Sequence, residues 1–302
     1  MPPEGTQLTL DGKVLSLSNL DKVLYPKAGF TKGQVIDYYI RIAPVLLPHL
    51  KDRALTLKRY PNGVEGGFFY EKKCPVHRPK WVKTAPVWSD TNNAEIHYCL
   101  ANDLPTLVWA ANLADLELHT SLAKRDKLEQ PTVMVFDLDP GPGTDILDCA
   151  EIGLWLRNFF EELKLKSFAK TSGSKGLQVY VPLNTKVTFD DTKNFSREVA
   201  MNFAARHPDR IVAQMAKALR KNKVFIDWSQ NDHHKTTVCV YSLRAKDHPT
   251  VSTPVKWDEV EAAVKKKTKL SFEADDVVAR VKKYGDLFEP VLELKQKLPK
   301  IS

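Results

Sequence analysis

The sequence predicts an α+β fold with α/β-like character, in which helices pack on β-sheets. Short apolar runs rich in β-branched residues, such as residues 133–136, are bounded by turn residues and are typical of strands. Longer segments with apolar residues at helical spacing separate most of these runs. The resulting order of strands and helices is that of sheets covered by helices. A parallel sheet and a mixed sheet are both compatible with this order.

The first part of the chain is expected to contain strands and two helices. In order, the expected elements are a strand or hairpin at 6–17, a helix from 32 to about 47, a strand at 54–60, a helical stretch at 105–112 and a strand at 115–119. Thr31 is a suitable N-cap for the first helix, since its hydroxyl can accept a hydrogen bond from a free backbone N–H. The apolar stripe of that helix is Val35, Tyr38, Tyr39, Ile42 and Leu46.

A charged connector at residues 120–130 precedes the second part of the chain, and we interpret it as a seam between two lobes. The elements expected after it are a strand ending near 139, a helix to about 163, strands at 167–170 and 177–182, helices at 190–206 and 209–221, a hairpin of 223–228 with 236–241, and a mostly helical stretch at 256–302. The apolar stripe expected for the first of these helices is Leu147, Ala150, Leu154 and Phe159. We expect one module over residues 1–302, with sub-lobes of about 1–125 and 126–302.

Composition narrows the class of protein. Lys and Arg number 45 against 37 Asp and Glu, a net charge of +8, which permits nucleic-acid binding without requiring it. No run of about 18 apolar residues and no basic-then-apolar N-terminus is present, so a cytoplasmic location is expected. The cysteines are scattered, and we expect reduced thiols at Cys74, Cys99, Cys149 and Cys239. Cys74 and His77 have the spacing of half a zinc site, but no second half is evident.

Asp137 and Asp139 are the most informative residues of the sequence. They end an apolar strand that Pro140 and Gly141 stop, and residues two apart on a strand share a face. Two adjacent carboxylates repel each other, and a divalent cation bound between them removes that cost. The alternative interpretation is a pair of solvated aspartates in a turn.

Two further segments of the second part point to nucleotide chemistry. The loop at 171–176 offers two serines, two glycines and Lys175, groups that suit phosphate oxygens. Asp227 ends another apolar strand, which is unexpected unless the carboxylate is paired or binds a metal. Lys235, Arg244 and Lys246 follow it. Three carboxylates, a phosphate-type loop and trailing cations together predict nucleotidyl transfer by two metal ions.

Four motifs in this order resemble the archaeo-eukaryotic primase superfamily, and in particular the polymerase domain of bacterial ligase D. They are Phe136-Asp137-Leu138-Asp139-Pro140, Thr171-Ser172-Gly173-Ser174-Lys175-Gly176-Leu177, Lys223-Val224-Phe225-Ile226-Asp227-Trp228-Ser229-Gln230-Asn231 and Tyr241-Ser242-Leu243-Arg244. The resemblance extends from Asn19 to about residue 290. It implies a primase-type catalytic core with a mixed β-sheet flanked by helices, and an N-terminal lobe packed on it.

The resemblance also implies roles for individual residues. The metal-binding catalytic triad is Asp137, Asp139 and Asp227. The residues that hold the incoming nucleotide are Lys58, His119, Ser172, Lys175, Gln178, Arg244 and Lys246. The DNA 5′-phosphate pocket of the N-terminal lobe is Asn19, Lys22 and Lys32. The template contacts are two of Phe68, Phe69 and Tyr70, with the spacing favouring the last two, together with Lys217 and Arg220. From the residues alone, core packing of the aromatic triplet and a satisfied histidine near the core at His119 remain alternatives.

The activity implied by the resemblance is a primase-like polymerase. It would add ribonucleotides, in preference to deoxyribonucleotides, to primer 3′ ends at DNA breaks or gaps, with two Mn²⁺ or Mg²⁺ ions. The implied partners are DNA with a 5′-phosphate, NTPs and dNTPs, the end-binding protein Ku and an ATP-dependent DNA ligase in the same or another chain. No Lys-x-Asp-Gly ligase motif occurs in the sequence. The implied location is the cytoplasm, at the bacterial nucleoid.

The sequence departs from the family pattern at Gln178, where the family usually has histidine. Glutamine can donate a hydrogen bond to a phosphate but carries no positive charge, so weaker triphosphate binding or a lower rate is expected. One alternative function is therefore a DNA-end-binding module with weak catalysis. Another is a metal-dependent phosphohydrolase of the haloacid-dehalogenase type, which also has an Asp-x-Asp strand but normally Thr or Val where Gly141 stands here.

Overall fold

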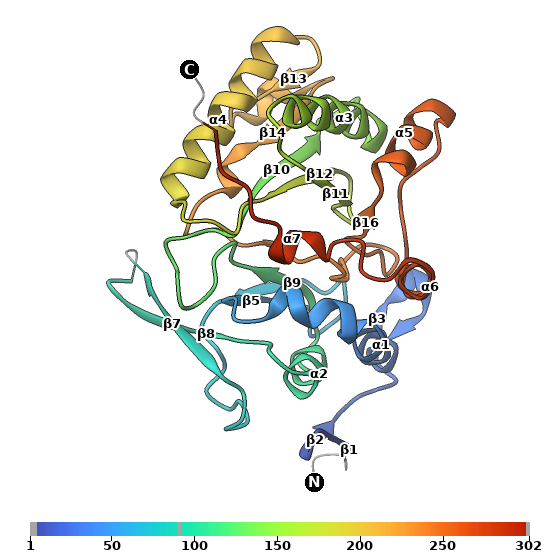
Figure 1. Ribbon diagram of the computed structural model, residues 1–302. Coiled ribbons are helices and arrows are strands. Elements are labelled where there is room, and N and C mark those ends of the chain that lie inside the picture. The colour runs from blue at the N-terminus through green and yellow to red at the C-terminus, as the bar shows by residue number, and fades with distance from the viewer. Residues whose placement is uncertain (1–4, 90–91, 300–302) are drawn as a thin grey trace. The chain divides into compact units, whose positions relative to one another are not determined.

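Two separate six-stranded β-sheets, each with its own helices, organise the chain in the computed structural model, which describes residues 5–89 and 92–299 (Figure 1). The first compact unit consists of residues 1–121, 238–251 and 272–285, and the second of 122–237, 252–271 and 286–302. The chain thus leaves the first unit after Ser121, close to the expected seam, and returns to it twice. Residues 1–4, on which the expectation of no secretory signal rests, lie outside the described part.

The first unit contains the N-terminal elements and a sheet in the order β15-β9-β5-β8-β7, with β6 paired to β5. Its strands are β1 (Thr6–Leu10), β2 (Lys13–Leu17), β3 (Val23–Tyr25), β4 (Phe30–Thr31), β5 (Leu55–Arg59), β6 (Phe69–Glu71), β7 (Thr84–Ser89), β8 (Ala94–Cys99) and β9 (Asp115–Thr120), and β15 (Thr237–Val238) enters it at Val238. Its helices are the 3₁₀ turn η1 (Pro26–Ala28), α1 (Lys32–Leu50), α2 (Leu104–Asn112) and α6 (Ala274–Tyr284).

Helix α1 forms as the sequence predicts. The Thr31 hydroxyl accepts a hydrogen bond from the Gln34 N–H, and the Gln34 side chain accepts one from the Thr31 N–H, which together cap the helix. All five residues of the expected apolar stripe are buried. The helix continues to Leu50, three residues beyond the expected end, with Pro44 and Pro48 inside it.

The second unit is built on a mixed sheet in the order β13-β14-β10-β12-β11-β16. Its strands are β10 (Val133–Pro140), β11 (Phe168–Thr171), β12 (Leu177–Pro182), β13 (Ile211–Val212), β14 (Val224–Asp227) and β16 (Pro254–Val255). Its helices are α3 (Ile146–Glu162), α4 (Phe189–Arg206), α5 (Trp257–Lys266), α7 (Pro290–Glu293) and the 3₁₀ turns η2 (Lys217–Arg220) and η3 (Trp228–Gln230). Only β13 and β14 pair in parallel, while the other neighbours are antiparallel. The α+β class and the mixed sheet are therefore confirmed.

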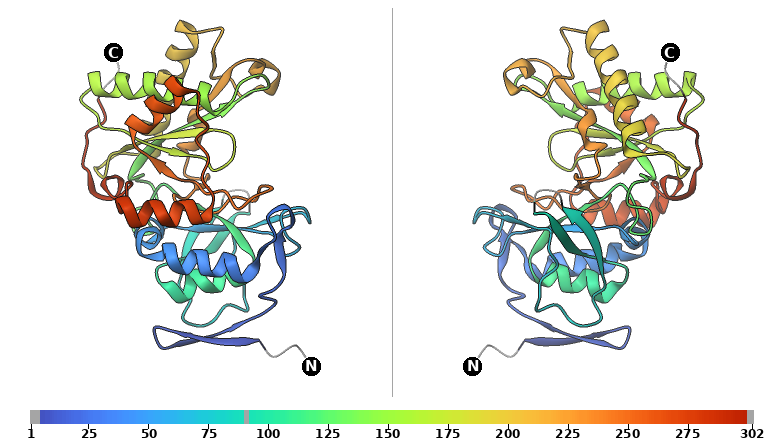
Figure 2. Two further views of the ribbon diagram at one scale, coloured as in Figure 1. Left: turned by 90° about the vertical axis from the view of Figure 1, so that its right-hand side faces the viewer. Right: turned by 90° about the vertical axis from the view of Figure 1, so that its left-hand side faces the viewer.

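Helix α3 covers one face of this sheet, and the carboxylates project from the other. Phe136 of β10 packs against Phe160 of α3 with ring centroids 5.3 Å apart, and a side chain in place of Gly153 would collide with Leu177. Helix α3 also lies beside α5 (Figure 2). Because side chains alternate along a strand, the odd-numbered residues of β10, Asp137 and Asp139 among them, project from the opposite face.

Three expectations about the second part of the chain were wrong. The helix expected at 209–221 is instead β13 followed by an irregular segment with η2, because Ile211 pairs with Val224 and sheet pairing outweighs helical spacing. The hairpin of 223–228 with 236–241 does not form, since β14 pairs with β10 and β13 while β15 joins the other sheet. The buried stripe of α3 is Ile146, Cys149, Ala150, Ile152, Gly153, Leu156 and Phe160, because the close approach at Gly153 fixes which face meets the sheet.

The expectation of four reduced cysteines was also wrong. Cys74 and Cys99 form a disulfide, with their Cα atoms 4.9 Å apart, while Cys149 and Cys239 are free and buried. The Cys74 N–H donates to the His97 carbonyl, which brings the two distant segments together in a way that spacing does not reveal. The bonded Cys74 has no thiolate that could bind a metal, so Cys74 and His77 do not form half of a zinc site. Within the described residues, no helix is long and apolar enough to cross a membrane.

Candidate active site

A row of polar side chains crosses the sheet of the second unit at Asp137. On one side Asp137 lies opposite Asp227 of β14, and on the other it lies opposite Gln178 of β12, which in turn lies opposite Lys170 of β11. Residues in register on neighbouring strands share a face and are about 5 Å apart. Asp139 is two residues further along β10 on that face. The structure therefore brings the three carboxylates to one place, as the sequence predicts.

The environment of Asp137 fits a bound cation. Its Oδ1 atom is buried and has no hydrogen-bond partner among the described residues. The pKa of Asp137 is raised to about 7, first by burial and then by repulsion from Asp139 and Asp227, while a hydrogen bond from Gln178 and the charge of Lys170 limit the rise. An orphaned carboxylate oxygen facing other carboxylates is the donor set that Mg²⁺ or Mn²⁺ prefers. A pair of freely solvated turn aspartates does not describe this site.

Asp227 is held in a fixed orientation. Its Oδ1 accepts hydrogen bonds from the Ser229 N–H at 2.9 Å and the Ser229 hydroxyl at 2.6 Å, and its Oδ2 accepts one from Gln230 at 3.0 Å. Lys235 in turn donates to the Ser229 hydroxyl. These bonds begin the turn η3 directly after β14, so the same contacts that end the strand also aim its terminal carboxylate.

Lys170 is a functional candidate that the sequence reasoning missed. Its side chain is fully buried, its ammonium donates to the Ser252 hydroxyl at 2.6 Å, and it lies over the Tyr180 ring at 5.3 Å. A buried lysine is as unusual as a buried aspartate and indicates a nearby negative charge. The signal was present in the sequence, since Lys170 ends an apolar strand as Asp227 does.

Gln178 does not lie in the open loop but within β12, where its side chain is buried. It hydrogen-bonds with Asp137 and accepts a weak bond from the Tyr180 hydroxyl at 3.4 Å. In this structure the amide therefore contacts a metal-ligand candidate, and any contact with a nucleotide phosphate would come in addition.

The Ser/Gly loop between β11 and β12 is closed by Ser172. Its hydroxyl accepts hydrogen bonds from the N–H groups of Ser174 at 3.2 Å and Gly176 at 3.0 Å. A side chain at Gly176 would place its Cβ 2.1 Å from the Leu138 carbonyl, so only glycine lets the loop pass this close to the strand that carries Asp137 and Asp139. Lys175 at the loop tip is exposed. The loop thus lies next to the strand of the carboxylates, with an exposed ammonium at its tip.

A second cluster, in the first unit, is centred on Glu117 of β9, a residue that the sequence reasoning did not single out. The Glu117 carboxylate is almost fully buried and contacts two cations, Lys58 and Arg244, and the imidazole of His119. Its Oε2 is 3.2 Å from Lys58 Nζ, 3.0 Å from His119 Nε2 and 3.2 Å from Arg244 Nε. Its Oε1 accepts from the Tyr60 hydroxyl and the Ala245 N–H. The cluster unites three predicted nucleotide-binding residues around one carboxylate.

Charge balance governs this Glu117 cluster. Burial alone would raise the pKa of Glu117, but His119, Arg244 and Lys58 together hold that pKa far below its ordinary value. Burial lowers the pKa of His119, and its hydrogen bond with Glu117 partly opposes this. His119 is thus a satisfied, mostly buried histidine that also belongs to a cation cluster. Lys58 and Arg244 against the single carboxylate of Glu117 leave a net positive charge that suits a triphosphate, and the neutral His119 can add a hydrogen bond.

The aromatic triplet is exposed, which excludes core packing. Phe68, Phe69 and Tyr70 are 53%, 45% and 55% exposed. Phe68 and Tyr70 share one side, with ring centroids 5.7 Å apart, and Lys58 Nζ lies 4.4 Å from the Phe68 ring. Phe69 faces the other way, 5.1 Å from the Arg59 guanidinium. The pair favoured by spacing, Phe69 and Tyr70, therefore does not share a face.

The three residues expected to bind a DNA 5′-phosphate lie together at the start of α1. The Lys22 N–H donates to the Asn19 carbonyl, and the Lys32 N–H donates to the Lys22 carbonyl. Lys32 is mostly buried, with its ammonium 2.6 Å from the Ser18 carbonyl, whereas Lys22 is exposed and bonds to Asn62 at 3.2 Å. Burial and the neighbouring Lys22 lower the pKa of Lys32 to about 8. Two ammonium groups beside a helix N-terminus form a setting that attracts phosphate.

The remaining predicted contacts lie on exposed segments. Lys217 is exposed on η2, and the Arg220 guanidinium stacks on Phe225 at 3.7 Å and donates to the Met215 carbonyl. The Arg220 carbonyl also lies so close to Gly141 that a side chain there would collide with it. Lys246 is exposed in the first unit.

One group of three possible metal ligands among the described residues is more closely spaced than the three aspartates. Asp232, His233 and His234 offer ligand atoms within 4.8 Å of one another. The Asp232 carboxylate, however, already pairs with Lys193 at 2.5 Å and accepts from the His234 N–H. The Asp232 oxygens therefore already have hydrogen-bond and ion-pair partners, whereas Asp137 Oδ1 has no hydrogen-bond partner among the described residues.

Comparison with known proteins places these features in a family. The model of the family described as LigD, primase-polymerase domain, matches residues 31–288. The multifunctional non-homologous end joining protein LigD of Mycolicibacterium smegmatis is 40% identical over 277 residues, which cover 91% of this chain and 36% of that protein. The bifunctional non-homologous end joining protein LigD of Bacillus subtilis is 32% identical over 272 residues, 90% of this chain and 43% of that protein. The chain thus spans less than half the length of these relatives.

The fold also matches a solved structure. The polymerase domain from Mycobacterium tuberculosis ligase D in complex with DNA superposes with a TM-score of 0.86 at 35% sequence identity. The match covers 92% of this chain and 98% of that one.

Proposed function

We propose, from the premise that the chain belongs to the LigD primase-polymerase domain family, that it extends primer 3′ ends at DNA breaks and gaps with preference for ribonucleotides. Membership of this family makes the chain a nucleotidyltransferase. The substrate choice and the individual residue roles are the proposal, and the carboxylate row at Asp137 is the observation that carries it.

In this proposal Asp137, Asp139 and Asp227 hold two Mn²⁺ or Mg²⁺ ions. The chemistry that such ions supply is a lower pKa for the primer hydroxyl and stabilisation of the leaving pyrophosphate. The protein contributes orientation, because Ser229 and Gln230 fix Asp227 and Gln178 fixes Asp137. Lys170 offsets part of the negative charge of the row before metal binds.

The nucleotide-binding role is assigned to two groups of residues. Lys58, His119 and Arg244, arranged by Glu117, would neutralise the triphosphate, with Lys246 nearby in sequence. Ser172 and Lys175 of the loop beside the carboxylates would bind phosphate oxygens, and Gln178 would donate a hydrogen bond. We expect Gln178→His to lower the KM for GTP because it adds a donor that can be charged. An unchanged KM and kcat in steady-state extension assays would remove Gln178 from the nucleotide site.

The DNA is assigned to the first unit and to the η2 segment. Asn19, Lys22 and Lys32 would bind the 5′-phosphate of the downstream strand. The exposed rings of Phe68, Phe69 and Tyr70 offer stacking surfaces for template bases. Lys217 and Arg220 would contact the template strand.

The wider setting is proposed from the relatives, whose names place them in non-homologous end joining. We propose that residues 1–302 act as one polymerase module, with the 5′-phosphate and template contacts in the N-terminal part. Ku and an ATP-dependent DNA ligase would be its partners, with the ligase in the same or another chain. The place of action would be the cytoplasm, at the nucleoid.

The test is primer extension on gapped DNA with a 5′-phosphate on the downstream strand, with GTP compared with dGTP and Mn²⁺ with Mg²⁺. We expect extension in both metals and faster addition of GTP than of dGTP. Equal rates for the two nucleotides would contradict the ribonucleotide preference. Tight gap binding without any extension would instead identify an end-binding module with lost catalysis, and phosphate release from phosphomonoesters would identify a hydrolase.

A further inference from the structure

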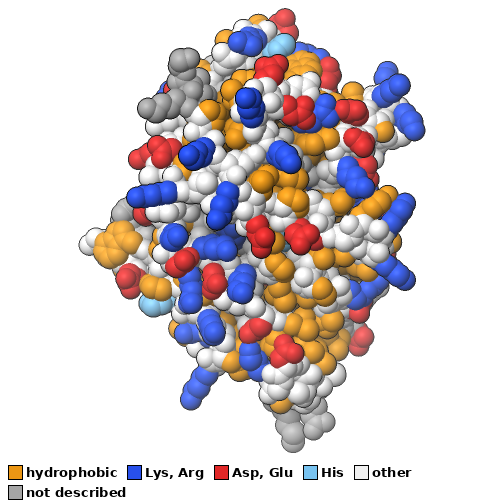
Figure 3. Space-filling view, viewed as in Figure 1, with side chains coloured by type: hydrophobic (Ala, Val, Ile, Leu, Met, Phe, Trp, Pro, Cys, Tyr) orange, Lys and Arg blue, Asp and Glu red, His pale blue; other side chains and the backbone are white. Residues whose placement is uncertain are grey.

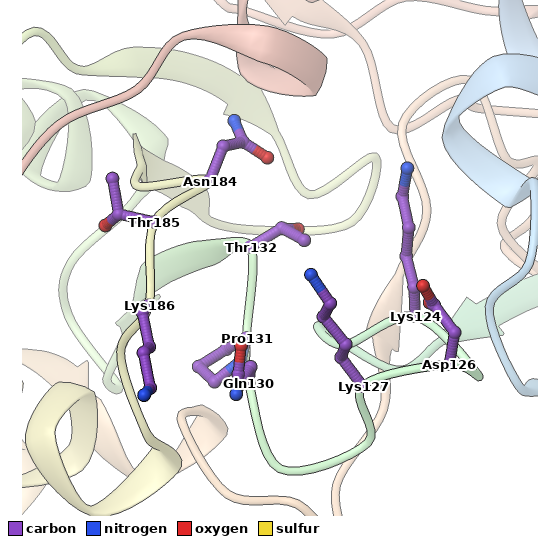
Figure 4. Close-up of a pocket in the computed structure, with 9 residues that line it drawn as sticks. All are labelled: Lys124, Asp126, Lys127, Gln130, Pro131, Thr132, Asn184, Thr185 and Lys186. Atoms are coloured by element: carbon purple, nitrogen blue, oxygen red, sulfur yellow. The ribbon is translucent and has the colours of Figure 1, made fainter.

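A basic pocket lies in the second unit at the end of β10 that is remote from the carboxylates. Its volume is about 520 Å³, and the residues that matter for its chemistry are Lys124, Lys127, Lys186, Thr132, Asn184 and Thr185 (Figure 4). Lys124 and Lys127 come from the connector before β10, and Lys186 comes from the segment after β12. None of these residues belongs to the site described above.

The walls of the pocket are fixed by hydrogen bonds. The connector is closed by a bridge between Ala123 and Pro131, and within it the Lys127 N–H donates to the Lys124 carbonyl. The Thr132 carbonyl accepts from the N–H groups of both Leu183 and Asn184 at 2.9 Å, which ties the two walls together. The lysines therefore project from an ordered frame, although their own side chains are flexible.

The charge of the pocket favours an anion. Three ammonium groups line it against one carboxylate, that of Asp126. Within the described residues, none of the three ammonium groups takes part in an ion pair, unlike Lys193, which pairs with Asp232. The Asn184 amide and the Thr185 hydroxyl already donate to carbonyls of the C-terminal segment, so the lysines are the free donors. Unpaired ammonium groups around an open hollow are typical of phosphate binding.

The surroundings favour a nucleic-acid phosphate over a small molecule. Lys127 and Lys186 are exposed, so the pocket does not enclose its ligand. Lys and Arg side chains are common on the face of the molecule shown in Figure 3. An open hollow lined by lysines suits the backbone of a long polyanion.

The strand β10 sets the distance from this pocket to the carboxylates. Thr132 precedes the strand and Asp137 lies five residues further on, which corresponds to about 17 Å at roughly 3.3 Å per residue. Successive base pairs of duplex DNA are separated by about 3.4 Å along the axis, so for a duplex whose axis follows β10 this length corresponds to about five base pairs.

We propose that this pocket binds a backbone phosphate of the primer–template duplex about five base pairs upstream of the primer end. The inference rests on the proposed polymerase function and adds to it a contact for the duplex that has already been made. It predicts that the three lysines contribute to DNA affinity only when the duplex is long enough to reach them.

The test compares two triple variants with the same loss of charge in the same unit. One carries Lys124→Ala, Lys127→Ala and Lys186→Ala, and the control carries Lys265→Ala, Lys266→Ala and Lys269→Ala, which change exposed lysines at the end of α5 and after it. DNA affinity is measured by fluorescence anisotropy over a salt series, with primer duplexes of about 3 and about 12 base pairs, each closed at its upstream end by an uncharged linker so that the short duplex stays paired. Equal melting temperatures confirm that both variants fold.

On the long duplex, we expect the pocket variant to bind about tenfold more weakly than the control. Its slope of log affinity against log salt should be smaller by about 0.9 for each lost phosphate contact. On the short duplex, the two variants should bind equally. Identical behaviour of the variants on both duplexes would overturn the proposal, as would an effect confined to the KM for free GTP. At saturating DNA, the kcat of extension by the pocket variant should equal that of the parent protein. If the parent protein itself shows no extension, the result contradicts the proposed polymerase function and not the pocket.

Discussion

The Asp137 carboxylate is the residue at which the chemistry of the second unit can be tested by pH. Its pKa of about 7 results first from burial and then from repulsion by Asp139 and Asp227. A group with a raised pKa in the folded protein destabilises the folded, metal-free state as pH increases through that value. A divalent cation binds the ionised form and must displace the proton below about pH 7.

Stabilisation by Mn²⁺ should therefore depend on pH. We expect Mn²⁺ at a fixed concentration to raise the melting temperature more at about pH 8 than at about pH 6, because the proton competes at the lower value. Differential scanning fluorimetry of the EDTA-treated protein provides the measurement. An identical rise at both pH values would contradict the assignment of Asp137 as a metal ligand with this pKa.

Glu117 makes a residue-scale prediction for the first unit. Glu117→Gln removes the charge that orients Lys58, His119 and Arg244, so we expect the KM for GTP to rise about tenfold, while kcat changes less. Glu71→Gln is the matched control, because Glu71 forms a partly buried ion pair with Arg59 in the same sheet. A lower melting temperature with an unchanged KM would show that Glu117 only supports the fold.

At the scale of elements, the N-terminus of α1 is where charge and local structure meet. Phosphate binds the charged form of Lys32, whose pKa of about 8 means that the charge is lost as pH rises through that value. The preference for a 5′-phosphorylated gap should be constant below about pH 7 and should decline above about pH 8. Affinities for phosphorylated and unphosphorylated gaps across this range give the preference directly.

Two variants sharpen this test. Lys22→Ala removes the neighbouring positive charge, so the decline of its residual preference should move to higher pH. Lys51→Ala changes an exposed lysine at the other end of α1 and should leave the profile of the parent protein unchanged. If the parent protein binds phosphorylated and unphosphorylated gaps equally at every pH, the assignment of Asn19, Lys22 and Lys32 as the 5′-phosphate pocket is wrong.

Elements with a strong local signal were predictable, whereas those set by distant partners were not. The cap at Thr31 and the apolar run that ends in Asp137 and Asp139 determine α1 and β10 within a few residues. The segment after Arg206 was misjudged, because Ile211 finds a strand partner and Asn231 turns inward to bond the backbone of Val135. Such partners are separated by many residues and leave no trace in local spacing.

The residues of the candidate site also differ in whether the sequence alone could predict them. The three aspartates were predictable because each carboxylate interrupts or ends an apolar run. Glu117 was not, since its importance lies in what it contacts across the sheet, whereas Lys170 left a signal in the sequence as a charge at the end of an apolar run. The aromatic triplet is a further example. The strand β6 places Phe68 and Tyr70 on one side and Phe69 on the other, and the sequence alone did not show this.

At the scale of the whole molecule, the chain visits each of two units more than once, and the residues proposed to bind metal and nucleotide are found in both. The carboxylates and the Ser/Gly loop belong to the second unit, whereas Lys58, His119 and Arg244 belong to the first. Arg244 reaches the first unit only because the chain returns to it at residues 238–251. A division of the sequence into two consecutive lobes does not capture this arrangement.

The most direct test of the account is primer extension by Asp137→Ala and Asp139→Ala on a gapped, 5′-phosphorylated DNA, with DNA binding measured in parallel. Asp190→Ala, which changes an exposed aspartate in the first turn of α4, is the control. We expect extension to fall by at least about a thousandfold in the first two variants, with gap affinity and control activity unchanged. Extension within about tenfold of the parent protein in either variant would contradict the account.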